Sequence, residues 1–386
     1  MLAIAGATLG GTAAQAGISS SSQADHWGYF FGDHHTRDTD VILKPQKMTL
    51  PAAIAQLGTS NSTEYALLTN GELWAWGQGT HGQLGDGRDA NSFTAPVRVH
   101  FPAGATISYI PTDAMPYDTG LAVDTRGNVW GWGFNQSGEL CLGSRQSYDR
   151  PQELPLSAVT ALAGADGHAV FDSRGTVYSC GRNNDGGLGT GKKTSSTVPV
   201  RVKGLPAGVV VKTLVSSWEN AGAVLANGAY YDWGYDGAGQ LGIGTINVSS
   251  DVPVKVSLPG PVAQVAEGGS SADNGQTIVM LADGSLYAWG NDTWSQLGDR
   301  GTFRQPSPVP IHPPTDVTYA VIASGGASSY AIDTAGNVWA WGKGTRGELG
   351  DGTTQKSATP VMADSGASMV SSTAGNAAVA GGTSAR

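Results

Sequence analysis

A short pattern of glycine, aromatic, leucine and proline residues recurs six times along the chain, and this repetition limits the fold more than any other feature. Six residues before each anchor glycine stands another glycine, three before it an aromatic residue, and seven after it a leucine. The anchors recur at intervals of roughly 50 residues, which is in the range of propeller blades. Registers held across six copies do not arise by chance, so the chain is a repeat protein. The anchors are Gly77, Gly133, Gly181, Gly234, Gly290 and Gly342.

Each copy is predicted to form four antiparallel strands. The first glycine stands in dipeptides such as Asn70-Gly71, which accept the positive φ of a tight hairpin. Side chains alternate along a strand, so Trp74 and Trp76 are expected to pack on the same side of it. A proline such as Pro96 then opens the last strand, a position that suits a strand start or an edge. No helical periodicity competes with this interpretation.

The two ends of the chain supply a seventh copy. The segment after Pro360 resembles the first two strands of a repeat but lacks the Trp-Gly strand, whereas Trp27-Gly28 stands alone near the start. A ring needs closure, because a blade buries its faces only against neighbours. The alternative, a decayed hairpin at residues 373–376, leaves Trp27-Gly28 unexplained.

We therefore predict an all-β fold, a seven-bladed β-propeller of four-stranded antiparallel blades. One domain spans residues 24–386, with six whole repeats and one blade shared between 24–50 and 362–386. The predicted structural anchors are Trp27, Gly28, Trp76, Gly77, Trp132, Gly133, Gly181, Trp233, Gly234, Trp289, Gly290, Trp341 and Gly342.

The first residues resemble a targeting signal. Residues 1–16 are small and apolar and end in Ala14-Gln15-Ala16, an A-x-A cleavage pattern, and residues 17–23 form a spacer. No basic residue precedes the apolar stretch, so a plain Ala/Gly leader is the alternative. We expect residues 1–16 to be a signal peptide and the protein to be secreted.

Charge and hydropathy exclude two classes of partner. A formal net charge of −9 and scattered Lys and Arg residues provide no basic surface for a nucleic-acid backbone. No run of 18 apolar residues occurs, so the sequence predicts no membrane span. The 57 glycines follow no G-X-Y period, and the 11 tryptophans argue against disorder.

The repeat resembles that of a known family. The strand around Trp76-Gly77, then G-Q-L-G-D-G at residues 82–87 and a Pro-Val pair, resembles the regulator of chromosome condensation repeat, from about residue 24 to the end. The family's nuclear member implies nucleotide exchange on a small GTPase, although no basic tail or nuclear signal matches here. The leader favours a secreted bacterial branch, whose β-lactamase inhibitory protein has shorter repeats and is a precedent for target binding.

Motifs typical of catalysis or metal binding are explained by turns. Gly77–Gly82 fits G-x-G-x-x-G but lies between antiparallel strands, where a dinucleotide site needs a helix. Asp86, Asp299 and Asp351 follow Leu-Gly and are expected to form turns, since they lack the ligand run of a calcium loop. We predict no catalytic, cofactor or metal residues. A hydrolase or lyase that uses rim carboxylates stays a third hypothesis.

The two cysteines occupy repeat positions. Cys180 replaces the tryptophan that precedes an anchor glycine, and Cys141 replaces the glycine after Leu140. A buried thiol is one interpretation of Cys180. A bridge to Cys141 in the preceding blade is the other, and it requires Cα atoms within about 7 Å.

Topology sorts the loops into two rims. Antiparallel strands alternate in direction, so the first-to-second and third-to-fourth connections share one rim. Two tryptophans outside the registers, Trp218 and Trp294, fall there, among aromatic, Asn and Asp residues typical of recognition surfaces. The alternative is that each aromatic covers the edge of its own blade. We expect a monomer that binds a protein, or a glycan, through this binding rim: Trp218, Glu219, Asn220, Trp294, Tyr117, Asp118, Phe134, Asp166, His168, Tyr235 and Asp236.

Overall fold

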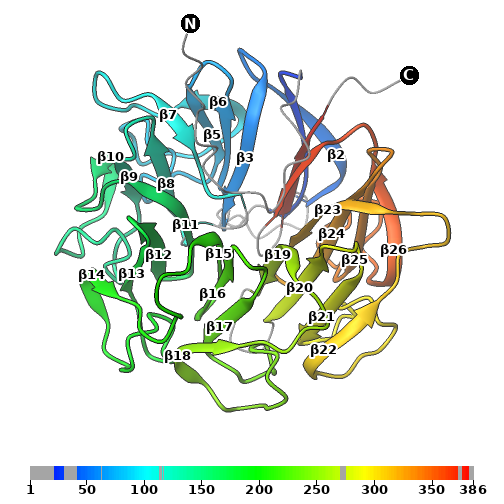
Figure 1. The fold of residues 1–386 in the computed structure, drawn as a ribbon. Coiled ribbons are helices and arrows are strands. Elements are labelled where there is room, and N and C mark those ends of the chain that lie inside the picture. Colours follow the sequence, from blue (N-terminus) through cyan, green and yellow to red (C-terminus); the bar gives the residue numbers. More distant parts are fainter. Residues whose placement is uncertain are drawn as a thin grey trace, which may run out of the picture.

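The chain folds into a ring of seven blades (Figure 1). The computed structural model describes residues 21–29, 41–61, 63–112, 115, 117–269, 275–372 and 376–381. The described residues contain strands β1 to β28 and no helix. Each blade is a four-stranded antiparallel sheet, which confirms the predicted all-β seven-bladed propeller. The predicted signal peptide, residues 1–16, lies outside the described residues.

Six blades are continuous in sequence, and their first strand lies innermost (Figure 1). Blades 1 and 2 contain β3 (Ile54–Ser60), β4 (Thr63–Leu68), β5 (Leu73–Gly77) and β6 (Ser92–Arg98), then β7 (Ile107–Tyr109), β8 (Thr119–Asp124), β9 (Val129–Gly133) and β10 (Tyr148–Glu153). Blades 3 and 4 contain β11 (Val159–Ala165), β12 (His168–Ser173), β13 (Thr176–Gly181) and β14 (Ser196–Arg201), then β15 (Val211–Ser217), β16 (Asn220–Leu225), β17 (Tyr230–Gly234) and β18 (Ser250–Lys255). Blades 5 and 6 contain β19 (Val262–Gly268), β20 (Gln276–Leu281), β21 (Leu286–Gly290) and β22 (Gln305–Ile311), then β23 (Tyr319–Ser324), β24 (Ser328–Asp333), β25 (Val338–Gly342) and β26 (Ser357–Asp364).

Blade 7 is shared between the two ends of the chain. Its inner strands are β27 (Met369–Ser372) and β28 (Asn376–Ala380), and its outer strands are β1 (Gln23–Tyr29) and β2 (Val41–Thr49). Strand β1 pairs antiparallel with β28, with Trp27 opposite Ala377. The closing blade predicted from Trp27-Gly28 is therefore confirmed.

The core lies between adjacent blades. The tryptophan before each anchor glycine, or Cys180 before Gly181, is buried. Trp130 and Trp132 pack in one cluster, as side-chain alternation predicts. Trp74 and Trp339 are only half-buried, which the register did not predict. The Nε1 of Trp339 donates to Asp333 Oδ2 at 2.9 Å, so this outer tryptophan keeps its polar edge near a hairpin carboxylate.

Five boundaries between blades are held by what we term tryptophan joints. In each joint, the indole Nε1 of one blade donates to a main-chain carbonyl of the preceding blade. That carbonyl belongs to the residue before the repeat leucine; the Trp132 bond to Gln83 O, for example, is 2.8 Å long. The glycine after that leucine lies under the indole, and a Cβ on Gly85 would stand 2.8 Å from Trp132 Nε1. The five joints are Trp132 to Gln83, Trp233 to Gly187, Trp289 to Gln240, Trp341 to Gln296 and Trp27 to Glu348.

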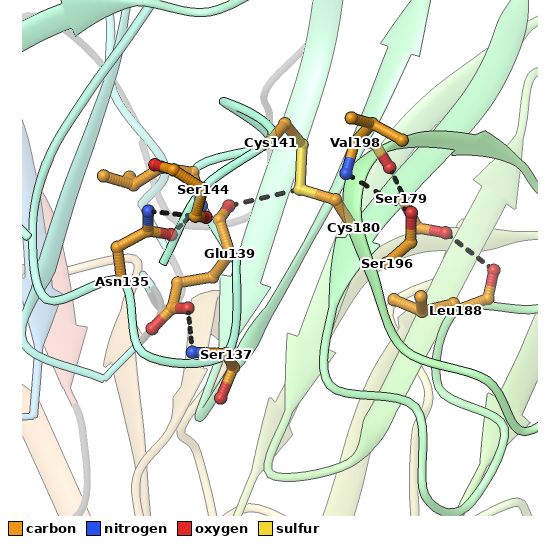
Figure 2. Close-up of a disulfide and its surroundings, with 11 residues drawn as sticks. Asn135, Ser137, Glu139, Cys141, Ser144, Ser179, Cys180, Leu188, Ser196 and Val198 are labelled. Carbon is orange, nitrogen blue, oxygen red and sulfur yellow. Dashed lines mark hydrogen bonds between the residues drawn. A yellow bond between two sulfur atoms is a disulfide. The ribbon is translucent and has the colours of Figure 1, made fainter. Parts of the chain in front are cut away.

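A disulfide holds the boundary between blades 2 and 3 (Figure 2). Cys141 and Cys180 are joined with their Cα atoms 5.5 Å apart, so the bridge left open by the sequence is formed. Cys141 takes the position under the missing indole with a φ of 58°, and Cys180 Sγ lies 3.3 Å from Glu139 O. We term this contact the disulfide joint. A cysteine pair has replaced a tryptophan–glycine pair at the same place in the ring.

Candidate functional site

Turns from all seven blades meet at one end of the ring axis. The connections between the first and second strands enclose a cavity of about 100 Å³, which we term the mouth. The predicted rim topology is the reason for this convergence, because every first strand is innermost and ends at the same side. The mouth is lined by Asn61, Met115, Tyr117, Ala165, Asp166, Ser216, Ser217, Trp218, Glu267, Gly268, Gly269, Ser324, Gly325 and Ser372.

Trp218 occupies an unusual position in the mouth. It is the first residue of a tight turn that links β15 to β16, with Ser217 paired to Asn220. Its φ of 27° lies in the left-handed region, where bulky residues are strained by about 1–3 kcal/mol. The corresponding turn residues of blades 1 and 3 are Asn61 and Asp166, which tolerate this conformation better. A half-buried tryptophan is therefore held at the axis at a cost to the backbone.

Beside Trp218, charged residues connect two turns. Arg182 lies between blades 3 and 4, with its Nη1 2.5 Å from Asp166 Oδ2 and 3.4 Å from Glu219 Oε1. Burial raises the pKa of Asp166, and Arg182 opposes that rise. Burial, then the neighbouring Asp185, raises the pKa of Glu219 to about 7. The arginine fixes the turn that carries Trp218 against its neighbour.

An aromatic group lies next to the mouth in blade 2. Tyr117 is 41% exposed and its ring packs edge-on against Phe134, with centroids 6.0 Å apart. Phe134 also packs against His81 of blade 1. His81 Nδ1 lies 3.0 Å from a carboxylate oxygen of buried Asp118, whose pKa is raised by burial. Tyr117 is therefore presented to solvent by a supported aromatic cluster.

Several predicted rim residues are buried and support turns. His168 Nε2 donates to Asn220 O at 3.1 Å, and burial lowers the pKa of this imidazole to about 4. Asn220 Nδ2 donates to Tyr235 O at 2.6 Å. Asp236 accepts from Leu241 N and from the Thr245 hydroxyl. The side chains of Asp118, His168, Asn220 and Asp236 are buried. The Asp118 carboxylate contacts the side chains of His81 and Asn61, whereas the polar atoms of the other three bind backbone groups of the loops.

The two off-register tryptophans occupy different places. Trp218 lines the mouth, whereas Trp294 is half-buried in the β21–β22 loop and is not among the residues around the cavity. Tyr235 is half-buried in the β17–β18 loop and is also outside the cavity lining. The mouth therefore brings together Tyr117, Asp166 and Trp218 from the predicted rim.

A buried acidic cluster under the mouth was not predicted. Tyr230 donates to Glu267 Oε1 and lies 3.3 Å from Asp232 Oδ2, between blades 4 and 5. Burial raises the pKa of Glu267 to about 7, and burial and then Glu267 raise that of Asp232 well above its usual range. The repeat alignment distinguishes these residues, since the other five continuous blades have Leu or Val where Tyr230 stands and Ala, Gly or Ser where Asp232 stands.

Within the described ranges, no group of three or more His, Cys, Asp or Glu side chains is placed to hold a metal ion. A helix that would span a bilayer is likewise absent from those ranges. The mouth lining contains two carboxyl groups, from Asp166 and Glu267, and no Lys or Arg. The chemistry of the mouth is thus acidic and aromatic.

Comparisons with known proteins agree with this architecture. The chain is 32% identical over 286 residues to the ultraviolet-B receptor UVR8 of Arabidopsis thaliana, which covers 73% of this chain and 63% of that receptor. The crystal structure of human WBSCR16 has a TM-score of 0.80 at 20% identity and covers 94% of this chain and 99% of its own. Prp20p from Saccharomyces cerevisiae has a TM-score of 0.80 at 20% identity, over 95% of this chain and 93% of its own.

The repeats themselves match a family model in six places. The model describes the regulator of chromosome condensation (RCC1) repeat and matches residues 70–110, 126–171, 174–217, 227–272, 283–332 and 335–380. These matches cover most of the chain, and each runs from the outer strands of one blade into the inner strands of the next. The chain belongs to the RCC1 repeat family.

Proposed function

We propose that this protein is a non-catalytic scaffold that binds a protein partner through the binding rim, with Trp218 in the mouth as the central contact. The position of Trp218 carries the proposal. A tryptophan is kept in a left-handed turn at the axis, where blades 1 and 3 have Asn61 and Asp166. Strain of this kind is retained where it serves a function, and Trp and Tyr dominate protein-binding hot spots.

The charges of the mouth favour a basic side chain on the partner. Asp166 and Glu267 line the cavity without a lysine or arginine in its wall. An entering cation would favour the ionised form of Glu267, whose pKa burial has raised, and would share Asp166 with Arg182. Tyr117 and Trp218 line the same cavity, and an aromatic ring stabilises a cation placed over its face. The yeast relative in fold, Prp20p, is described with binding properties to Gsp1p and histones, which supports a protein as the partner class.

We also propose that the protein is secreted. Disulfides persist mainly in oxidising compartments, and Cys141 and Cys180 form one in the core between two blades. Residues 1–16 have the composition of a signal peptide that ends at Ala16. N-terminal sequencing of the mature protein from the culture medium should begin after Ala16. An intact Met1 in the cytosol would contradict secretion and would favour the exchange-factor hypothesis.

Trp218→Ala tests the binding site, with Trp294→Ala as the matched control. Both tryptophans are half-buried in rim loops, but only Trp218 lines the mouth. Partners retained from culture supernatant by the immobilised wild-type protein are identified, purified and titrated against each variant by calorimetry. We expect Trp218→Ala to weaken binding at least 30-fold, corresponding to about 2 kcal/mol, with an unchanged circular dichroism spectrum. Equal affinities for Trp218→Ala and the wild type would refute the site.

A further inference from the structure

The loop after each anchor glycine has a fixed internal contact. Two residues after the anchor, blades 2 and 3 have Asn135 and Asn183. The Asn135 Nδ2 donates to two loop carbonyls, Ser144 O at 3.2 Å and Gln146 O at 2.9 Å. Asn183 Nδ2 donates in the same way to Lys192 O and Thr194 O. The amide therefore serves as a donor between carbonyls nine and eleven residues further along the chain.

Blades 1 and 6 show the same arrangement of carbonyls. They have Gly79 and Gly344 at this position, and a Cβ on either glycine would overlap a carbonyl oxygen, Ala90 O and Gln355 O respectively. Both carbonyls belong to the residue eleven positions after the glycine. In four blades, then, this carbonyl faces the position two residues after the anchor.

Blade 5 places an acid where blades 2 and 3 have the asparagine. Asp292 Oδ1 accepts from Leu297 N at 2.9 Å, as Asn135 Oδ1 accepts from Leu140 N. Its Oδ2 replaces the Nδ2 donor and has no hydrogen-bond partner among the described residues. The side chain is 0% exposed. By register, the carbonyls nine and eleven residues later belong to Gly301 and Phe303. The Gly301 carbonyl accepts a hydrogen bond from the Ser295 hydroxyl at 3.1 Å, but Asp292 Oδ2 offers these carbonyls no donor of its own.

A second carboxylate lies at the same point. A Cβ on Gly301 would stand 2.8 Å from Asp299 Oδ1 and 3.2 Å from Asp292 Oδ2, so both carboxyl groups flank one position. Asp299 accepts hydrogen bonds from Gly301 N and Gln305 Nε2. Blades 2, 3 and 4 have Leu142, Thr190 and Ile243 where blade 5 has Asp299. The pair of acids is confined to blade 5.

Blade 4 shows how a single acid is accommodated at this position. Asp236 also replaces the asparagine, but its Oδ2 accepts from the Thr245 hydroxyl at 2.9 Å. Residue 245 corresponds to Gly301 in blade 5, where no side chain can donate. Asp292 Oδ2 therefore has no hydroxyl donor like the one that binds Asp236 Oδ2 in blade 4.

We propose that the β21–β22 loop of blade 5 binds a calcium ion through Asp292 Oδ2, the Asp299 carboxylate and the main-chain carbonyls of Gly301 and Phe303. Calcium takes six to eight oxygen ligands, mixes carboxylates with carbonyls and water, and accepts irregular geometry. The ion would take the place of the asparagine amide, since both present positive charge to the same carbonyls. The sequence-based expectation that Asp299 only forms a turn did not consider Asp292, seven residues earlier.

Calcium binding is tested on the whole protein with the Asp292→Asn variant, which restores the residue type of blades 2 and 3. Calorimetric titration with CaCl2 after EDTA treatment and dialysis, together with thermal unfolding with and without the ion, should show binding and a raised melting temperature for the wild type. The variant should bind calcium at least tenfold more weakly. It should melt above the metal-free wild type at neutral pH, because its amide again donates to the two carbonyls.

Asn135→Asp is the reciprocal control. Leu142 stands where blade 5 has Asp299, so this variant should lose thermal stability and gain no additional calcium site. Absence of calcium binding by the wild type at millimolar concentration would overturn the proposal. So would equal affinities for the wild type, Asp292→Asn and Asp299→Asn. A wild type that is indifferent to calcium but loses stability between pH 5 and pH 8 would replace the ion with a proton shared by the two acids.

Discussion

The disulfide joint between blades 2 and 3 differs in chemistry from the five tryptophan joints, although all six use equivalent repeat positions at their blade boundaries. A tryptophan joint combines apolar burial with one hydrogen bond across the boundary. The disulfide joint has less apolar volume and one covalent bond. Phe171 fills part of the difference, because most blades have alanine at its position, as with Ala66 and Ala331. Three coupled changes, at Cys141, Phe171 and Cys180, thus preserve one contact.

This difference shows that the repeat selects a contact between blades rather than individual residues. In a tryptophan joint, the glycine must be small because the indole covers it. Where the indole is lost, the glycine position can carry a side chain, and Cys141 uses it to reach the next blade. Substitutions in a tryptophan joint and in the disulfide joint should therefore lower the free energy of unfolding by different amounts.

The largest loss is expected at a tryptophan joint. Trp132→Ala removes a 0% exposed indole and its bond to Gln83 O, so the free energy of unfolding should fall by about 4–5 kcal/mol. Denaturation in guanidinium chloride measures this loss. Trp74→Ala, in the half-buried outer register, should cost less than half as much. Equal losses would mean that the joint has no special role.

Removal of the disulfide should lower the free energy of unfolding slightly less than Trp132→Ala does. Cys141 and Cys180 are 39 residues apart, so closing this loop is worth about 4 kcal/mol in the loop-entropy model, and native bridges contribute about 2–4 kcal/mol. We expect Cys141→Ala/Cys180→Ala to lower the free energy of unfolding by about 3 kcal/mol. Dithiothreitol should destabilise the wild type and leave the double variant unchanged. A double variant that remained sensitive to dithiothreitol would contradict this assignment.

The disulfide joint should also be pH-dependent. Burial raises the pKa of Glu139, whose carbonyl contacts Cys180, to about 8. The folded protein therefore keeps a proton that the unfolded chain releases near pH 4.5, so stability is greatest below that pH and falls as pH rises to 8. Glu139→Gln introduces the residue type of Gln83 and Gln240. In chemical denaturation, the free energy of unfolding of this variant should equal that of the wild type at pH 4.5 and exceed it by about 2 kcal/mol at pH 8.5.

Glu348→Gln is the control for this pH effect. Glu348 has the corresponding position in blade 6 but lies 3.2 Å from Lys343 Nζ. Its replacement by glutamine removes an ion pair, so this variant should not have a higher free energy of unfolding than the wild type at pH 8.5. A gain equal to that of Glu139→Gln would assign the effect to the whole repeat position rather than to the disulfide joint.

The smallest effect is expected from Phe171→Ala in a variant in which the disulfide joint has been converted into a tryptophan joint. Cys141→Gly/Cys180→Trp restores the tryptophan–glycine pair but crowds the indole against Phe171, so overpacking should cost about 1–3 kcal/mol beyond the loss of the bridge. Adding Phe171→Ala should recover about 1–2 kcal/mol of that cost. Thermal unfolding of the two variants in dithiothreitol measures the difference. A triple variant no more stable than the double one would show that Phe171 does not compensate for the indole.

The sequence predicts the ring well because each register has one physical cause. Hairpin glycines need positive φ, joints need the Trp–Gly pair, and closure needs the strand around Trp27. The disulfide could not be decided, because the distance between Cys141 and Cys180 depends on how two blades pack. Register alone did not separate Trp74 from Trp76 in burial, since both lie on the same face but at different depths.

The site was predicted less well. Trp218 was found because it lies outside every register, and the structure places it in the mouth. His168 and Asn220 were predicted to belong to the rim, and both side chains bind backbone carbonyls there. The sequence does not show whether a polar residue beside a turn binds the backbone or faces a partner. Glu267 was missed because a single acid in an apolar strand has no local pattern. Its significance depends on Tyr230 from the neighbouring blade.

The shared blade 7 makes the order of synthesis matter. Trp27 pairs with a strand roughly 350 residues further along the chain, so a ribosome that adds about 5–20 residues per second needs about 20–70 s between making β1 and making its partner. During that interval β1 has no β28 to pair with, and the ring stays open. A chain truncated before β28 never closes, so closure reports that synthesis has reached the last blade. Export before closure would leave this final step to the far side of the membrane.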